Sequence, residues 1–313
     1  MWILWSLLGI LLFSVFLCVL VAYVCFIRIF ASPKRKRSKE DSIPSGKVYQ
    51  SIRPRLEVWM KNARTLPHKR MSIRSFDGIE LYGRYYEYQK HAPIEILFHG
   101  YRGNAIRDMS GGIDRCFRMG HNALVIEQRG SCESTCKVIS FGINESRDCE
   151  AWVDFTVREI DPEAKIVLTG VSMGAATVML CTARPLPRNV VAVLADCGYT
   201  SAREIIQKVM SDMRLPPRLL YPFVRLGARL FGHFDPDEDS PMEALKRSRL
   251  PVIFIHGDED DFVPYSMSVK NYEACASQKR LVTIRGAGHG VAYPTDIQAY
   301  EAELADFLAP YLS

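Results

Sequence analysis

The residues with the clearest chemical potential stand at positions 170–174, which read Gly-Val-Ser-Met-Gly and fit the pattern Gly-x-Ser-x-Gly. An apolar run at 166–168 precedes this pattern, and a stretch of small and apolar residues at 175–180 follows it. A strand, a sharp turn with a central serine and a helix together are typical of a nucleophile elbow. The glycines suit such a turn, because a side chain at either position would collide with the neighbouring strand or helix. Ser172 is therefore the candidate nucleophile; for the pentapeptide alone, an ordinary glycine-rich turn is the alternative.

A serine hydroxyl needs an adjacent base, and the base needs an orienting acid. Around a nucleophile elbow the chain order is serine, acid, histidine, so both partners are sought after Ser172. His289 stands in the sequence Gly-Ala-Gly-His-Gly after an expected strand at 281–284, where small neighbours leave room for its ring. The loop at 256–264 follows another expected strand and contains four acids: Asp258, Glu259, Asp260 and Asp261. Composition alone does not choose among these acids.

The other six histidines lack the glycine-rich setting of the candidate base. Four of them have polar neighbours and are expected at the surface: His68, His91, His121 and His233. The remaining two, His99 and His256, each close an expected strand before a glycine. We expect structural roles for both.

Short apolar runs alternate with helical segments along most of the chain. The runs lie at 94–98, 123–126, 166–169, 190–195, 252–255 and 281–284. Continuous apolar runs of this length are typical of strands covered on both faces, as in a parallel sheet. Before them, 72–76 and 79–86 flank an Asp-Gly turn and predict an antiparallel hairpin, preceded by a lead-in helix at 47–66. The pattern predicts an α/β fold, a mostly parallel twisted sheet with an antiparallel start and helices on both faces.

The N-terminal segment is long and apolar. Residues 2–27 are 26 consecutive uncharged positions, and about 20 apolar residues suffice to span a bilayer as a helix. Trp2 and Trp5 suit an interfacial position. We predict one uncleaved transmembrane helix over residues 1–30; the alternative is a cleaved signal peptide, although the stretch lacks a positive n-region. The basic cluster at 34–39 then predicts, by the positive-inside rule, that the rest of the chain is cytoplasmic.

Charge and cysteine usage restrict the partners. The chain carries a formal charge of +5, of which +4 falls in residues 28–41 and only +1 in residues 42–313. A nearly neutral globular part argues against nucleic-acid binding. Seven cysteines outside the apolar segment are scattered without a Cys-x-x-Cys pair, so neither a disulfide framework nor a zinc site is predicted. Free thiols agree with a cytoplasmic location.

Residues 199–249 interrupt the alternation with helix-like sequence between two expected strands. Such an insertion is expected to form a lid over the strand ends. Arg218, Arg225 and Arg229 form a stripe beside its apolar residues. An amphipathic helix that packs on its own domain is the favoured interpretation, and a lid that meets a membrane surface or an amphiphilic substrate is the alternative.

With these residues the chain resembles the α/β-hydrolase superfamily over roughly 70–311, and within it the prolyl-oligopeptidase-like and serine-aminopeptidase-like esterases. Their acid loop reads His-Gly-x-x-Asp-x-x-Val-Pro, which matches residues 256–264. The resemblance implies Asp260 as the catalytic acid, with Asp261 as the fallback. It likewise implies Ser172 as nucleophile and His289 as base.

Two further loops carry the resemblance. The family's His-Gly-x-x-Gly loop matches residues 99–103, which implies an oxyanion hole made of the backbone amides of Tyr101 and Met173. The family's Asp-Gln-Arg-Gly-x-Gly-x-Ser loop, which helps to frame the substrate pocket, corresponds to residues 127–134. Here it departs twice, with Glu127 in place of Asp and Cys132 in place of the second Gly.

The resemblance implies a serine hydrolase that cleaves a carboxylic ester of a small-molecule or amphiphilic acyl substrate and needs no metal or organic cofactor; the apolar N-terminal segment predicts that it is membrane-anchored. A serine peptidase of the same fold is the first alternative, and a catalytically silent membrane-anchored binding protein is the second. The predicted organisation is a transmembrane helix at 1–30, a basic juxtamembrane linker at 31–58 and a hydrolase domain at 59–313 that includes the lid-like insertion at 199–249.

Overall fold

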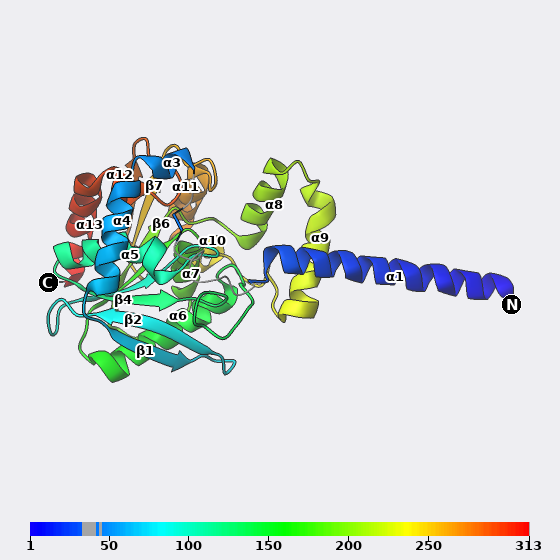
Figure 1. The fold of residues 1–313 in the computed structure, drawn as a ribbon, viewed down its shortest axis with the longest axis horizontal. Helices are drawn as coiled ribbons and strands as arrows, with labels where there is room; N and C mark the ends of the chain where they lie inside the picture. The colour runs from blue at the N-terminus through cyan, green and yellow to red at the C-terminus, as the bar shows by residue number, and fades with distance from the viewer. Residues whose placement is uncertain (33–41, 44–45, 313) are drawn as a thin grey trace.

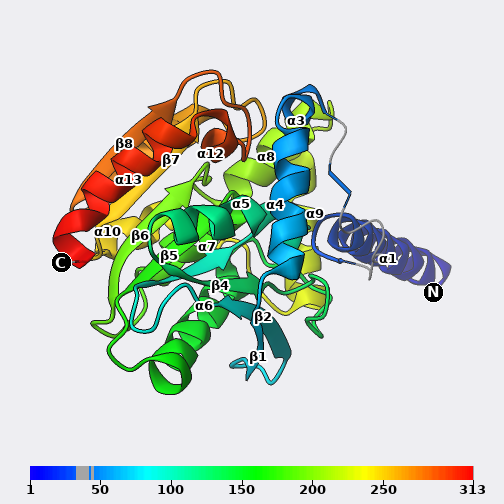
Figure 2. The same ribbon diagram turned by 60° about the vertical axis from the view of Figure 1, so that its left-hand side comes forward.

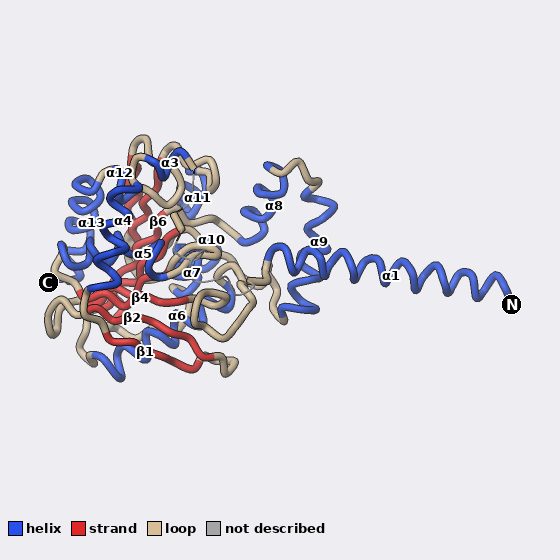
Figure 3. The backbone as a smooth tube through the Cα atoms, in the orientation of Figure 1, coloured by secondary structure: helices blue, strands red, loops and turns tan. Residues whose placement is uncertain are grey.

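A computed structural model describes residues 1–32, 42–43 and 46–312, and the basic cluster predicted at 34–39 lies outside these residues. The described residues form one eight-stranded sheet in the order β1-β2-β4-β3-β5-β6-β7-β8, with helices around it (Figures 1 and 3). The strands are β1 (Lys69–Arg74), β2 (Glu80–Tyr86), β3 (Ile94–Phe98), β4 (Asn122–Glu127), β5 (Ile166–Val171), β6 (Val190–Asp196), β7 (Val252–Gly257) and β8 (Lys279–Ile284).

The predicted sheet is confirmed, including its antiparallel start. β1 and β2 form a hairpin, and β2 also pairs antiparallel with β4, whereas the strands β3 to β8 are all parallel to one another. Gly78 in the hairpin turn has a φ of 82°, a conformation that glycine adopts without a steric penalty. Because the parallel strands all end at one edge, the loops that follow them gather there.

Helices cover both faces of the sheet, so its central strands are buried on both sides. One face packs against α6 (Ile143–Phe155), the π-helical turn η1 (Thr156–Ile160), α7 (Met173–Cys181), α10 (Pro241–Arg247) and α11 (Tyr265–Ala274). The other packs against α4 (Arg53–Thr65), α5 (Ala105–Arg118), α12 (Ala292–Thr295) and α13 (Ile297–Leu312). Within β3, the side chain of Ile96 packs in the core on the first of these faces and that of Leu97 in the core on the second, because successive strand side chains point to opposite faces.

The predicted lead-in helix is divided into two. α3 covers Lys47–Gln50, and α4 begins at Arg53 with Pro54 in its first turn. Proline has no backbone N–H and is favoured only where a helix begins, so it starts a new helix here. Trp59 and Met60 of α4 are buried.

The N-terminal helix α1 (Trp2–Ile29) is long and apolar enough to cross a membrane. Its residues up to position 20 are exposed, and it projects away from the body of the protein (Figure 1). Its inner end is different, because Ala22, Phe26 and Phe30 are buried against the rest of the chain. The packing of the folded part therefore reaches back to residue 22.

The insertion at 199–249 contains α8 (Ala202–Asp212), α9 (Pro217–Gly227), the π-helical turn η2 (Ala228–Gly232) and α10. α9 crosses the inner end of α1 (Figures 1 and 2). A side chain at Gly227 would overlap the carbonyl oxygen of Ala22, so glycine allows this close approach. The Phe231 ring adds edge contacts with Tyr23 at a centroid distance of 5.1 Å.

A charged cluster is buried between β3 and α5, on the second of the two faces of the sheet. Glu95 is fully buried and accepts hydrogen bonds from Arg115, from His121 Nδ1 at 2.9 Å and from Thr169 Oγ1 at 2.7 Å. The predicted surface position of His121 is therefore wrong, because its partner is distant in sequence. His68, His91 and His233 are exposed, as predicted.

This cluster gives a pH-dependent contribution to stability. Burial alone would raise the pKa of Glu95, but Arg115 and His121 outweigh it and lower the pKa from 4.5 to about 2. A carboxyl with a lowered folded-state pKa stabilises the protein above its unfolded pKa, and that contribution is lost as pH falls from about 4.5 to 2. Glu95→Gln is expected to cost about 3–5 kcal/mol at pH 7, because Arg115 is left buried without its counter-ion.

Denaturant unfolding of the full chain in detergent, at pH 7 and pH 3, measures this effect. The difference between wild type and Glu95→Gln should shrink at pH 3. Glu87→Gln is the control, because Glu87 is exposed and its carboxylate lies 3.5 Å from the ammonium of Lys69. A pH-independent difference would contradict the ionised state of Glu95.

Candidate active site

The Gly-x-Ser-x-Gly segment forms a tight turn between β5 and α7. Ser172 has φ 56° and ψ −115°, a strained conformation for a residue with a side chain. A Cβ on Gly170 would overlap the carbonyl oxygen of Gly174, and a Cβ on Gly174 would overlap that of Phe98. The steric reason predicted for both glycines is therefore present in the structure.

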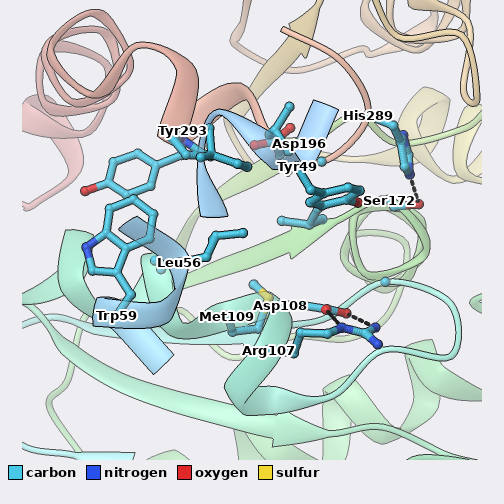
Figure 4. A pocket seen from close by; sticks show the side chains of 18 of the residues that line it. Tyr49, Leu56, Trp59, Arg107, Asp108, Met109, Ser172, Asp196, His289 and Tyr293 are labelled. Carbon is cyan, nitrogen blue, oxygen red and sulfur yellow. Dashed lines mark hydrogen bonds and ion pairs between the residues drawn. The ribbon is translucent and has the colours of Figure 1, made fainter. Parts of the chain in front are cut away.

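The side chains of Ser172, His289 and Asp260 form one hydrogen-bonded chain. The Ser172 hydroxyl donates to His289 Nε2 at 3.0 Å, and His289 Nδ1–H donates to Asp260 Oδ2 at 2.8 Å. Figure 4 shows His289 directed at Ser172. Residues separated by as many as 117 positions meet because β5, β7 and β8 end at the same edge of the sheet.

The loop after β7 holds Asp260 firmly in this position. Its Oδ1 accepts the backbone N–H groups of Phe262 at 3.0 Å and Val263 at 2.8 Å. Its Oδ2 also lies 3.0 Å from Nε2 of the buried His256, whose other nitrogen contacts Ser268. Burial alone would raise the pKa of Asp260, but the hydrogen bonds from His256 and His289 bring it well below its usual range.

The fallback acid Asp261 does not reach this hydrogen-bonded chain. Its side chain is exposed, and its carbonyl oxygen accepts a hydrogen bond from Lys208. The structural role expected for His256 is thus specific: it supports the Asp260 carboxylate.

The predicted oxyanion loop lies beside the serine. A Cβ built on Gly100 would lie 3.6 Å from Ser172 Cβ, so the backbone leading into Tyr101 adjoins the nucleophile. Met173 is the first residue of α7, and the first backbone N–H groups of a helix have no acceptor within the helix. The ring of His99 fixes the loop, because its Nε2 accepts the backbone N–H of Gln128 at 3.1 Å and its Nδ1 lies 2.8 Å from the carbonyl oxygen of Gly100.

Both departures in the loop at 127–134 have a local structural account. The longer Glu127 carboxylate accepts from the backbone of Ala105 at 3.2 Å and from Ser131 at 3.0 Å. Cys132 adopts φ 38°, in the left-handed region that favours glycine. Arg129 braces this loop through a buried ion pair with Asp148 and a second ion pair with the exposed Asp77, and no sequence pattern points to either pair.

A pocket of about 300 Å³ opens at the serine. Trp59 and Tyr293 stack in its wall at a centroid distance of 5.4 Å, and Figure 4 shows them across the pocket from Ser172. Asp196 also lines it; its Oδ2 accepts from Tyr300, whereas its buried Oδ1 has no hydrogen-bond partner among the described residues. Burial raises the pKa of Asp196. Its place at the end of an apolar strand is the signal by which the sequence could have revealed it.

One donor set in the described residues has the composition of a metal site. Cys197 Sγ, an oxygen of Asp260 and a nitrogen of His289 lie within 4.8 Å of one another. Burial raises the pKa of Cys197 well above its usual value, which disfavours the thiolate that binds metals. Asp260 and His289 are also already hydrogen-bonded to each other, so the set suits proton transfer better than metal binding.

The fold has known counterparts. The esterase Pf2001 of Pyrococcus furiosus superposes with a TM-score of 0.66 at 18% identity, covering 91% of this chain and 99% of that one. The chain has the α/β-hydrolase fold. Residues 225–313 match the model of the prolyl oligopeptidase family. Among curated proteins, YqkD of Bacillus subtilis is 26% identical over 68% of this chain and 70% of its own length. Protein bem46 of Schizosaccharomyces pombe is 24% identical over 69% and 68%.

Proposed function

We propose that the protein is a membrane-anchored serine hydrolase that cleaves carboxylic esters through an acyl-enzyme. The observation that carries this proposal is the hydrogen-bonded chain from Ser172 through His289 to Asp260. The α/β-hydrolase fold and the match to the prolyl oligopeptidase family support it. Pocket walls of stacked aromatic rings support a substrate with an apolar part.

In the proposed reaction, Ser172 Oγ attacks the ester carbonyl carbon while His289 Nε2 takes its proton. The oxygen that becomes negative is stabilised by the amides of Tyr101 and Met173, and one such donor typically contributes about 3 kcal/mol. His289 then returns the proton to the leaving alcohol as the carbon–oxygen bond breaks. Water, deprotonated by His289, attacks the acyl carbon. The bond from that carbon to Ser172 Oγ breaks, His289 returns the proton to Oγ, and the carboxylic acid is released. Throughout, Asp260 holds the ring orientation and stabilises the imidazolium.

The packing of α1 supports an uncleaved anchor rather than a signal peptide. Phe26 and Phe30 belong to the core around the lid insertion, and Ala31 forms a β-bridge with Val138. Removing a signal peptide would take these residues away and expose the core that they cover. All nine cysteines lie in the described residues and are free, which supports a cytoplasmic catalytic domain.

A serine peptidase is the second candidate, because the matched family is that of prolyl oligopeptidase. Amide and ester cleavage use the same nucleophile and base, so the pocket decides between them.

Turnover of two substrate panels by the full chain in detergent tests the proposal. A 4-nitrophenyl ester series of increasing acyl length should be hydrolysed, and a panel of aminoacyl 4-nitroanilides should not. Ser172→Ala should abolish both ester turnover and labelling by a fluorophosphonate probe. Faster cleavage of the anilides would favour the peptidase. A folded wild type that the probe does not label would favour a silent binding protein.

A further inference from the structure

The lid insertion carries an exposed surface that is both apolar and basic. Between 213 and 234 the chain has four arginines and no acidic residue. The side chains of Met213, Leu215, Leu219 and Leu230 are between 41% and 66% exposed. We call these four residues the lid patch. Large exposed apolar side chains next to arginines are typical of helices that lie in a membrane interface.

The position of the lid patch is set by α1. α9 crosses α1 where that helix enters the body, with Gly227 against Ala22 and Phe231 against Tyr23. Figures 1 and 2 show α8 and α9 on the side of the body from which α1 projects. The exposed residues 2–20 of α1, at 1.5 Å per residue, measure about 28 Å, which matches the hydrocarbon core of a bilayer. A bilayer around this part of α1 would have its surface at the level of α9.

We propose that the lid patch and the exposed side of α9 lie in the interface of the bilayer that α1 spans. The proposal rests on the membrane anchoring described above and assigns the lid a lipid partner. α9 then lies along the membrane surface. The lid bounds the active site from the membrane side, since Met173, next to Ser172, belongs to the same apolar core as Tyr221 and Val224 of α9. An amphiphilic ester could pass from the bilayer to Ser172 along this side.

The charges refine which arginines face lipid. Arg225 and Arg229 both pair with Asp235, so the stripe predicted from the sequence is partly neutralised within the protein. Arg214 and Arg218 are exposed and have no ion pair among the described residues. These two arginines are therefore assigned to anionic headgroups.

Quenching of tryptophan fluorescence by acyl-brominated phosphatidylcholine tests the proposal on the full chain. In wild type, quenching of Trp2 and Trp5 reports whether α1 is inserted. Leu219→Trp is then measured in a Trp2→Phe/Trp5→Phe background, relative to that background itself, which keeps the buried Trp59 and Trp152. Its control is Val58→Trp in the same background, because Val58 is 56% exposed on α4, away from α9 in Figure 1.

The lid residue is expected to be quenched and the control residue not. Adding phosphatidylglycerol should increase quenching at the lid, and Arg214→Glu/Arg218→Glu should remove that increase. If the wild type is quenched but Trp at position 219 is not, the proposal is overturned and the anchor is left intact. If the unquenched Trp at position 219 also has a blue-shifted emission, a second copy of the chain covers the lid. No quenching in wild type would overturn the anchoring itself. All these readouts are independent of catalysis.

Discussion

Asp260→Asn is expected to lower kcat for ester hydrolysis by about 10⁴-fold, because an amide cannot hold the His289 tautomer or balance the charge of the imidazolium. The carboxylate has this role only because His289 Nδ1 lies 2.8 Å from its Oδ2. Steady-state kinetics of the full chain in detergent measures the change. KM should change much less than kcat, because the carboxylate faces the histidine and not the pocket.

The neighbouring acid provides a matched control. Asp261→Asn removes the same charge one residue later, from an exposed side chain outside the hydrogen-bonded chain. Its kcat should stay close to that of wild type. Equal losses in the two variants would mean that the negative charge of the loop matters rather than the specific contact. A large loss in Asp261→Asn alone would identify the fallback acid as the catalytic one.

Phe30→Ala is expected to destabilise the folded domain by about 3–5 kcal/mol, although it lies at the end of the predicted membrane helix. The side chain is fully buried. Its ring contacts Phe141 and Phe234 edge-on at centroid distances of 5.7 Å and 5.1 Å. Removing it would leave a cavity between the anchor, the lid insertion and the loop before α6.

Denaturant unfolding of the full chain in one detergent measures this loss, with near-ultraviolet circular dichroism as the probe of the domain. The control is Phe16→Ala, the same substitution on α1 at a site that is 61% exposed. Phe16→Ala should leave the transition of the domain unchanged. An equally small effect of Phe30→Ala would mean that α1 is only a tether, in agreement with the domain boundary predicted at residue 30.

The fold follows from short-range patterns. Runs such as 94–98 and 252–255 are apolar at every position, and a strand of this kind is stable only when helices cover both of its faces. The Asp-Gly pair at the hairpin and Pro54 at the start of α4 act on their own backbone. The proline at position 54 favours a helix start there, but the apolar spacing across 47–66 favours one continuous helix.

Other features depend on partners distant in the chain. His121 has polar neighbours and is nevertheless buried, because Glu95 faces it from the adjacent strand. Arg225 and Arg229 resemble free cations on a helix, but both pair with Asp235. A hydrophobic stretch likewise does not reveal where the membrane part of α1 ends and the packed part begins.

The sequence by itself determined the sheet with its antiparallel start, the tight turn that presents Ser172, and the loops after the strands that carry His289 and the four acidic residues. These features depend on steric limits and periodicities within a few residues. Only the tertiary structure decided that Asp260 rather than Asp261 contacts His289, that Asp196 lines the pocket, and that the inner end of α1 packs on the lid. These contacts depend on which strand ends and helix faces meet, and short-range patterns do not encode a distance between side chains far apart in the chain.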